Sequence, residues 1–297
     1  MNNKLDIIAF AGPASLPLLA AQAERFYEKR GLDVTITFAH NSIELREGLS
    51  AGRYQLAQSA IDNAFALKEK ARVDIAVVLG GDNSFNHLIV RPEINSIADI
   101  KGRTVAVDAV DTAFALQLYE VLRRQGIRRN DYNVKPAGNS HARLALMAKD
   151  EDVVAAMLSP PFSITAKEKG FKDMGSTAAL VGEYQGSSLF ALRDWAAANN
   201  YTLIKFLRAT IEGFRWTLDP KNKADIINLI AQHLNIAKDI AAITYESTLG
   251  GFSRDGAVDM AGVVNVLKLR ATLEGGQSAA PDSYLDLTYF QKALATL

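Results

Sequence analysis

The chain has 297 residues, of which 48% are hydrophobic and 22% charged, and its 33 basic and 33 acidic side chains cancel. Without a net basic charge, the composition gives no indication of a nucleic-acid partner. The chain has no cysteine, which excludes disulfides, thiolate metal sites, iron–sulfur clusters and a cysteine nucleophile.

Short strand patterns alternate with longer helical patterns through the first 190 residues. Apolar runs and period-two alternation predict strands at residues 5–11, 33–39, 74–80, 103–109 and 152–158. Between them, residues 16–30 and 112–125 repeat apolar side chains at helical spacing and stop before Gly31 and Gly126. This alternation predicts an α/β fold with open, mostly parallel sheets covered by helices. At this length we expect two lobes, because a single core stops growing at about 250–300 residues.

A weak internal repeat supports two lobes. Residues 45–60 match residues 144–159 in pattern, each reading as helix, polar turn and strand. The match is one of pattern more than identity, so a coincidence between α/β segments remains the other interpretation. After Arg193 only helical patterns follow, at residues 194–218, 223–235, 238–249, 258–273 and near Tyr289. We expect these helices to pack on a lobe that is already built.

Sequence signatures of enzymes are mostly missing. The chain has no Walker loop, no GxGxxG after a strand, no GxSxG elbow and no HExxH helix. The four histidines, His40, His87, His141 and His233, show no metal-ligand spacing, and a lone loop histidine is more often a polar surface group. We therefore predict no catalytic residue, no metal and no cofactor.

Small polar residues follow several predicted strands where a helix begins. The candidates are Gly12, Ser15, Asn41, Ser42, Ser59, Asn63, Asp111, Thr112, Ala113 and Asn139. Free backbone N–H groups and the positive end of the helix dipole make such a junction a possible anion site. Taken singly, each side chain is better explained as a helix cap. Taken together they predict a ligand site, because parallel sheets bind ligands at the carboxyl ends of their strands.

Two loops add aromatic and amide side chains to these candidates. The first loop contains Asn83, Phe85 and Asn86, and the second contains Pro161 and Phe162. Their rings can form an apolar wall of a pocket, and the amides can donate hydrogen bonds to a ligand. Equally, both phenylalanines can seal the ends of the loops against their own lobes.

Several segments resemble the NMT1/THI5-like, or nitrate/sulfonate/taurine type, periplasmic substrate-binding proteins of ABC importers. The resemblance begins in residues 18–34 (LLAAQAERFYEKRGLDV) and 49–54, and is strongest in residues 97–115 (IADIKGRTVAVDAVDTAFA). It continues in residues 155–170 (AAMLSPPFSITAKEKG) and 251–269 (GFSRDGAVDMAGVVNVLKL). It therefore extends over nearly the whole chain.

The resemblance implies a two-lobed periplasmic-binding-protein type II (Venus-flytrap) fold. Its two crossing hinge strands would be His87–Arg91 and Ser187–Arg193. Lobe one would then consist of residues 1–88 and 190–297, and lobe two of residues 89–189. A ligand would bind in the cleft between the lobes.

The implied function is capture of a small organic, anionic solute (a sulfonate, an aromatic carboxylate or a pyrimidine-like molecule) without catalysis. Partners would be ABC permease subunits and no nucleic acid, and the protein would be a monomer. The resemblance also implies a periplasmic location. Residues 5–12 are interrupted by Asp6 and read as a strand rather than a signal peptide, so they fit either a cytoplasmic protein or one whose leader has been removed, and we expect the second.

An alternative is a cytoplasmic enzyme on the same fold, in pyrimidine/thiamine or menaquinone biosynthesis. The yeast-type pyrimidine synthases of this fold carry a cysteine-rich iron-binding motif. The absence of cysteine argues against that chemistry here. The sensor half of a regulator also shares the fold, but it would need a DNA-binding or signalling domain.

Overall fold

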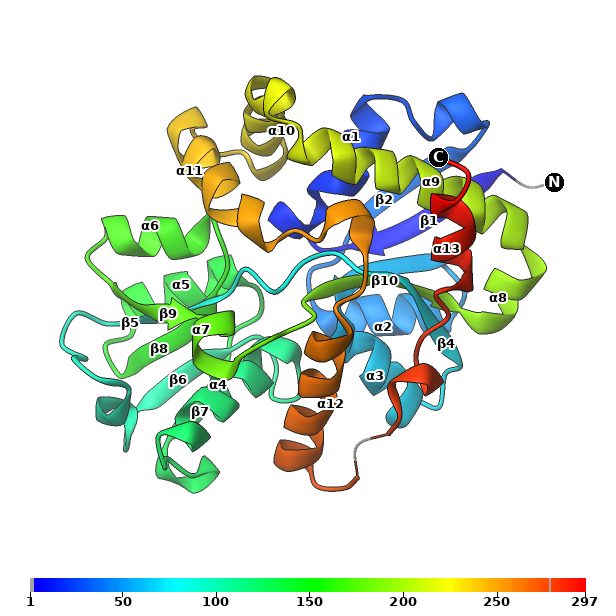
Figure 1. Ribbon diagram of the computed structural model, residues 1–297. Coiled ribbons are helices and arrows are strands. Elements are labelled where there is room, and N and C mark those ends of the chain that lie inside the picture. Colours follow the sequence, from blue (N-terminus) through cyan, green and yellow to red (C-terminus); the bar gives the residue numbers. More distant parts are fainter. Residues whose placement is uncertain (1–2, 278) are drawn as a thin grey trace.

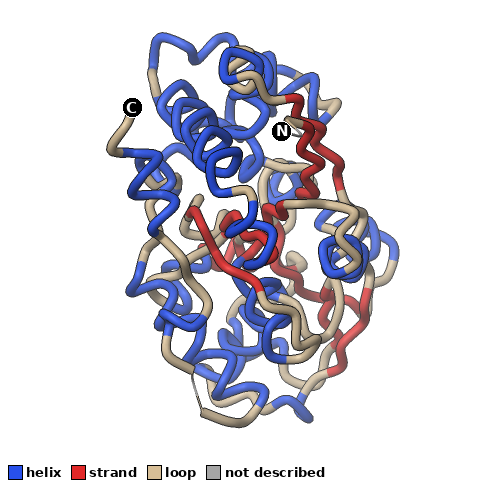
Figure 2. Tube along the Cα trace, turned by 90° about the vertical axis from the view of Figure 1, so that its right-hand side faces the viewer, coloured by secondary structure: helices blue, strands red, loops and turns tan. Residues whose placement is uncertain are grey.

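Two α/β lobes make up the computed structural model, which describes residues 3–277 and 279–297 (Figure 1). Each lobe contains one five-stranded sheet. Both chain termini lie on the same lobe (Figures 1 and 2). The predicted α/β class is confirmed, but both sheets are mixed rather than mostly parallel, because β10 and β5 run antiparallel to their neighbours. Among the described residues, no helix is long and apolar enough to cross a membrane.

The sheet of lobe one contains four strands from the first part of the chain and one strand that follows lobe two. Its order is β2 (Asp33–Phe38), β1 (Lys4–Ala9), β3 (Leu56–Ala60), β10 (Ser187–Leu192) and β4 (Ile75–Leu79). β1 pairs in parallel with β2 and β3, whereas β10 is antiparallel to β3 and β4. All five residues of β4 are buried, as expected for an apolar run covered on both faces.

The sheet of lobe two repeats this arrangement. Its order is β7 (Asn133–Pro136), β6 (Thr104–Val107), β8 (Val153–Leu158), β5 (His87–Val90) and β9 (Lys172–Ser176). β6 is parallel to β7 and β8, and β5 is antiparallel to β8 and β9. Each sheet thus has one strand from the other half of the chain inserted before its last strand. The matching sequences at residues 45–60 and 144–159 fall on equivalent elements, which supports the interpretation as a repeat.

Helices cover both sheets. Lobe one has α1 (Leu16–Ala23), α2 (Ser42–Ser50) and α3 (Ile61–Glu69), and lobe two has α4 (Ala113–Arg124), α5 (Ser140–Lys149), α6 (Phe162–Glu168) and α7 (Thr177–Val181). The C-terminal region adds α8 (Arg193–Ala198), α9 (Asn200–Leu218), α10 (Lys223–Leu234), α11 (Lys238–Thr248), α12 (Met260–Glu274) and α13 (Thr288–Leu294). The helix predicted over residues 16–30 ends at Ala23, and Arg25 just beyond it has a left-handed φ of 58°.

The chain passes between the lobes through residues 80–86 and 182–186, which we call the crossing segments. They contact each other, because the Gly186 N–H donates to the Asp82 carbonyl at 2.7 Å. The hinge strands expected at residues 87–91 and 187–193 differ from this arrangement: β5 and β10 lie within the sheets, and the crossing occurs just before each. The predicted lobe limits fall inside these two strands and stay a prediction.

The lobes also contact each other away from the crossing segments. α12 and α3 pack against α4, and α11 packs against α6. A single core cluster includes side chains of both lobes, such as Phe65 and Leu118. α12 lies between the two lobes (Figure 1), and its Val263 and Val266 side chains belong to this shared core cluster.

Candidate ligand-binding site

A cavity of about 320 Å³ lies between the lobes. Lobe one lines it through the ends of β1 and β3 and the starts of α2 and α3, and lobe two through the starts of α4, α5 and α6. The crossing segments and the last residues of α10 complete the wall. Ligand pockets of proteins have this character: enclosed, apolar over much of their surface, with a few convergent polar groups.

Eleven of the fifteen predicted site residues line this cavity. They are Gly12, Asn41, Ser42, Ser59, Asn63, Phe85, Asn86, Thr112, Ala113, Asn139 and Phe162. The sequence pattern located them because the carboxyl ends of parallel strands in both lobes face the same cleft. Direct contact of any one of them with a ligand stays a prediction.

The other four predicted residues lie outside the cavity lining. The Ser15 hydroxyl donates to the Gly12 carbonyl at 2.8 Å and is buried within the first turn of its helix. Asn83 pairs through its backbone N–H with the Gly251 carbonyl at 2.9 Å. Pro161 is buried next to Pro160, which lines the cavity in its place. Asp111 faces the other lobe, where it makes ion pairs.

Four helices of at least eight residues begin at the cavity wall: α2, α3, α4 and α5. At two of these starts the cap interpretation also holds, since Asn41 Oδ1 accepts from Glu44 N at 2.9 Å and Asn139 Oδ1 from Ala142 N at 3.0 Å. The Thr112 side chain does not cap α4; its hydroxyl donates to the Asp108 carboxylate. The positive ends of four helix dipoles, from both lobes, therefore lie at one cavity.

Arg143 adds a fixed positive charge to the site, at a position that no sequence pattern indicates. Its side chain is almost fully buried beneath the cavity, and its guanidinium lies 4.7 Å from the centre of the Phe114 ring. It donates to the carbonyls of Met157 (3.0 Å) and Gly138 (2.5 Å) and to Ser140 Oγ (3.0 Å). Burial lowers the pKa of Arg143, but a guanidinium stays charged at neutral pH. An arginine within a helical pattern gives no signal of this kind, because arginine is usually on the surface.

Two carboxyl groups also line the cavity, and both have raised pKa values. Desolvation by the surrounding protein raises the pKa of Asp108, although Arg143 and Thr112 act in the opposite direction. Burial likewise raises the pKa of Asp82, whose carboxylate accepts from Ser84 N (2.8 Å) and Ser187 N (3.2 Å). Asp82 therefore holds the crossing segments together, and Asp108 is the carboxyl left facing the cavity.

Aromatic rings form part of the cavity wall, at Phe10, Phe85, Phe114 and Phe162. Both interpretations of Phe85 hold, because its ring lines the cavity and also packs edge-on against Phe252 at 5.0 Å.

Three histidines, His40, His141 and His233, line the cavity as well, whereas His87 lies outside it and pairs with Asp173. The Nε2 atom of His233 is buried without a hydrogen-bond partner among the described residues. Within that part of the chain, no three His, Asp or Glu side chains are grouped to hold a metal ion.

Comparison with known proteins agrees with this geometry. The profile of the NMT1/THI5-like family matches residues 12–224, which confirms the family resemblance. A protein of Bordetella bronchiseptica RB50 superposes with a TM-score of 0.86 at 18% identity, covering 99% of this chain and 98% of that one. No curated protein matches the sequence.

Two further solved structures are those of solute-binding proteins. The alkanesulfonate-binding protein SsuA from Xanthomonas axonopodis pv. citri, bound to MOPS, gives a TM-score of 0.74 at 18% identity, covering 92% of this chain and 91% of that one. The periplasmic nitrate-binding protein NrtA from Synechocystis PCC 6803 gives a TM-score of 0.81 at 12% identity, covering 99% of this chain and 89% of that one. At such identities the likeness establishes the fold, which is the two-lobed periplasmic binding protein fold.

Proposed function

Because the chain belongs to the NMT1/THI5-like family, we propose that it is an ABC-importer solute-binding protein that captures a small organic anion. The observation that carries this proposal is the interlobe cavity, at whose wall α2, α3, α4 and α5 begin. Oriented backbone dipoles at helix starts favour anions, and the buried Arg143 guanidinium adds to the same field.

The solute's body would lie against the phenylalanine rings. Phe10, Phe85, Phe114 and Phe162 offer aromatic and apolar surface on both sides of the cavity. An alkyl sulfonate, an aromatic carboxylate or a pyrimidine-like anion combines such a body with a charged head. The sulfonate- and nitrate-binding neighbours support the anionic class. Binding would be non-covalent, and the solute would leave unchanged.

Transport requires that other proteins recognise the ligand-bound form. A ligand that contacts both lobes favours their closed arrangement by its differential affinity for that state. We propose that the protein acts as a monomer in the periplasm and that ABC permease subunits recognise the closed form. The periplasmic nitrate-binding neighbour supports this location.

Native mass spectrometry, followed by a thermal-shift screen, tests the proposal. The screen covers sulfonates, aromatic carboxylates, pyrimidines and inorganic oxyanions. We expect one class to raise the melting temperature in a concentration-dependent way and to be recovered unchanged at a stoichiometry of one. Conversion of a hit into a new mass would instead establish an enzyme, and the transport function would be wrong.

A variant that fills the cavity links any hit to this site. Thr112 lies at the start of α4 in the cavity wall, so Thr112→Phe places a ring where the solute would bind. We expect binding of the screen hit, measured by isothermal titration calorimetry, to weaken about tenfold or more. Because Thr112 is buried and its hydroxyl donates to Asp108, the free energy of unfolding should fall by about 1–3 kcal/mol, so the titration is made well below the melting temperature of the variant. Thr272→Phe, on the exposed side of α12, is the matched control. An unchanged dissociation constant for Thr112→Phe would remove this segment from the site.

A further inference from the structure

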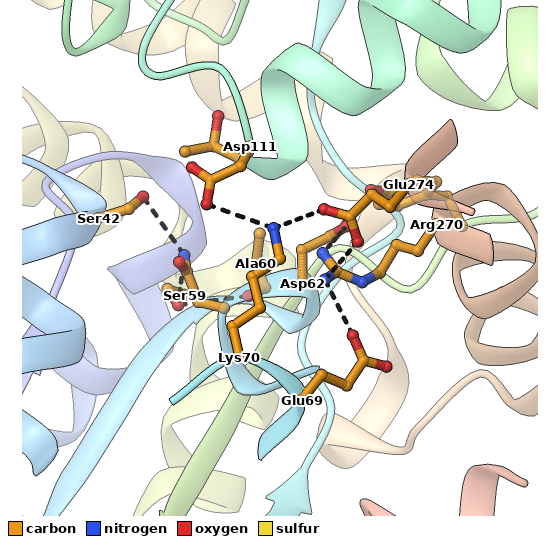
Figure 3. A network of polar contacts seen from close by, with 12 residues as sticks. Ser42, Ser59, Ala60, Asp62, Glu69, Lys70, Asp111, Arg270 and Glu274 are labelled. Carbon is orange, nitrogen blue, oxygen red and sulfur yellow. Dashed lines mark hydrogen bonds and ion pairs between the residues drawn. The ribbon is translucent and has the colours of Figure 1, made fainter. Parts of the chain in front are cut away.

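Asp111 joins the two lobes outside the cavity. It precedes α4 in lobe two, and its carboxylate lies 3.6 Å from Arg46 Nη1 in α2 and 3.5 Å from Lys70 Nζ at the end of α3. Lys70 also contacts Glu274 Oε1 at 2.7 Å, so its ammonium group lies between two carboxylates (Figure 3). Arg46 and Lys70 both belong to lobe one. We call Asp111, Arg46 and Lys70 the interlobe latch.

A buried ion-pair network fixes the lobe-one side of this latch. Arg270 of α12 is almost fully buried and lies 3.7 Å from Asp62, 3.1 Å from Glu69 and 2.9 Å from Glu274. Asp62 and Glu69 are in α3, so Arg270 holds α12 against α3 (Figure 3). The Tyr184 hydroxyl donates to Asp62 at 2.8 Å and extends the network to a crossing segment. Lys70 is thus positioned before lobe two approaches.

The latch lies away from the crossing segments. The crossing segments stay joined when the lobes rotate relative to each other. α3 begins beside a crossing segment, where the Ile61 N–H donates to the Gly186 carbonyl at 2.9 Å. Lys70 lies nine residues later, a distance of about 13 Å along a helix. Rotation of one lobe against the other about the crossing segments therefore separates Asp111 from Lys70 and Arg46.

We propose that the interlobe latch stabilises the closed arrangement of the lobes before a solute binds. The inference rests on the proposed function, in which closure is the step that traps the solute. Asp111 belongs to the same turn as Asp108 and Thr112, which line the cavity. A solute that contacts this turn therefore acts on the same segment as the latch, and the two contributions favour the same closed state.

The latch is partly exposed, which sets its strength and its response to salt. The exposed fractions of its side chains are 17% for Arg46, 35% for Asp111 and 44% for Lys70. Ion pairs of this kind are individually weak and are screened by salt. Removing both pairs is expected to lower the closed-to-open ratio by about three- to ten-fold.

Distance measurements between spin labels in the ligand-free protein test the latch. The chain has no cysteine, so Ala23→Cys in α1 and Ala148→Cys in α5 provide one exposed labelling site on each lobe. We expect a closed and an open population by double electron–electron resonance. Asp111→Asn should lower the ratio of closed to open molecules. Addition of about 0.5 M NaCl should lower this ratio in the wild type, by screening the ion pairs, but should not change it in the variant.

Two further variants keep the outcome unambiguous. Arg46→Gln removes the lobe-one partner and should produce a similar shift that is not additive with Asp111→Asn. Asp152→Asn makes the same charge change on lobe two, at an exposed side chain that makes no ion pair in the described structure, and should have no effect. Equal ratios in Asp111→Asn and the wild type, or a wild type without a closed population, would overturn the latch. No ligand is used, so such a result is distinct from a failed solute screen.

Discussion

Asp108 is the residue whose charge bears most directly on the identity of the solute. Its carboxyl faces the cavity, and desolvation raises its pKa. Asp108→Asn keeps the shape of the side chain and removes its negative charge. For an anionic solute, at a pH where Asp108 is ionised, we expect the dissociation constant to fall by up to about tenfold, because a repulsion in a poorly solvated site is removed.

Isothermal titration calorimetry with the hit from the solute screen measures this effect. Asp152→Asn, which changes an exposed carboxylate outside the cavity lining, serves as the control. Weaker binding by Asp108→Asn would contradict an anionic solute. It would instead indicate a solute that donates a hydrogen bond to this carboxylate, such as an aminopyrimidine.

At the residue level, the sequence predicted backbone positions better than side-chain roles. Asn41 and Thr112 line the cavity as expected because small polar residues at strand ends mark helix starts. Arg143 and His233 escaped prediction because each lies within a helical pattern, where periodicity suggests a surface or core position. Asp111 was expected at the ligand, but its partners come from the opposite lobe. No local pattern contains that information.

Among the secondary-structure elements, β9 is joined to β5 by backbone pairing and also by a side-chain contact between Asp173 and His87. His87 Nδ1 of β5 lies 3.0 Å from Asp173 Oδ2 of β9, and the Gly175 N–H donates to Asp173 Oδ1 at 3.0 Å. Burial alone would raise the pKa of Asp173, but these hydrogen bonds outweigh burial and hold the pKa at about 2. The ionised carboxylate therefore stabilises the folded state.

This contact predicts a pH-dependent stability. Because the folded pKa is below the unfolded value, the contribution is complete above about pH 4 and is lost as the pH falls toward 2. Asp173→Asn should lower the free energy of unfolding by about 1–2 kcal/mol at neutral pH. Urea denaturation of both proteins at a series of pH values should show this difference shrinking below about pH 4. A difference independent of pH would mean that the charge of Asp173 is not its source.

Element boundaries show where local pattern is sufficient and where it is not. α4 and α10 end within one residue of the predicted positions, and Gly126 after α4 has the expected left-handed φ of 75°. The helix predicted over residues 194–218 is instead divided at Asn199 into α8 and α9. The order of the strands in each sheet was beyond prediction, because β5 and β10 each join the sheet of the other half of the chain.

For the whole molecule, the arrangement of the lobes depends on how closely the crossing segments approach. A Cβ atom at Gly186 would overlap the Asp82 carboxylate and the backbone of Ser84 in the opposite segment. Both of these residues line the cavity, so the contact that joins the lobes also shapes one wall of the site. Sequence alone gives no sign of this close approach.

Gly186→Ala therefore tests whether the crossing segments determine both stability and binding. The added methyl group must push the segments apart, and overpacking of this kind costs about 1–3 kcal/mol in the free energy of unfolding. Because Asp82 and Ser84 would shift with the segment, affinity for the solute should fall as well. Gly250→Ala is the matched control, since a Cβ there meets no atom within 4 Å. Urea denaturation and titration calorimetry measure the two effects. If Gly186→Ala lost stability but kept full affinity, the cavity wall would be independent of the interlobe contact, and the two lobes would form the site without help from the segments that join them.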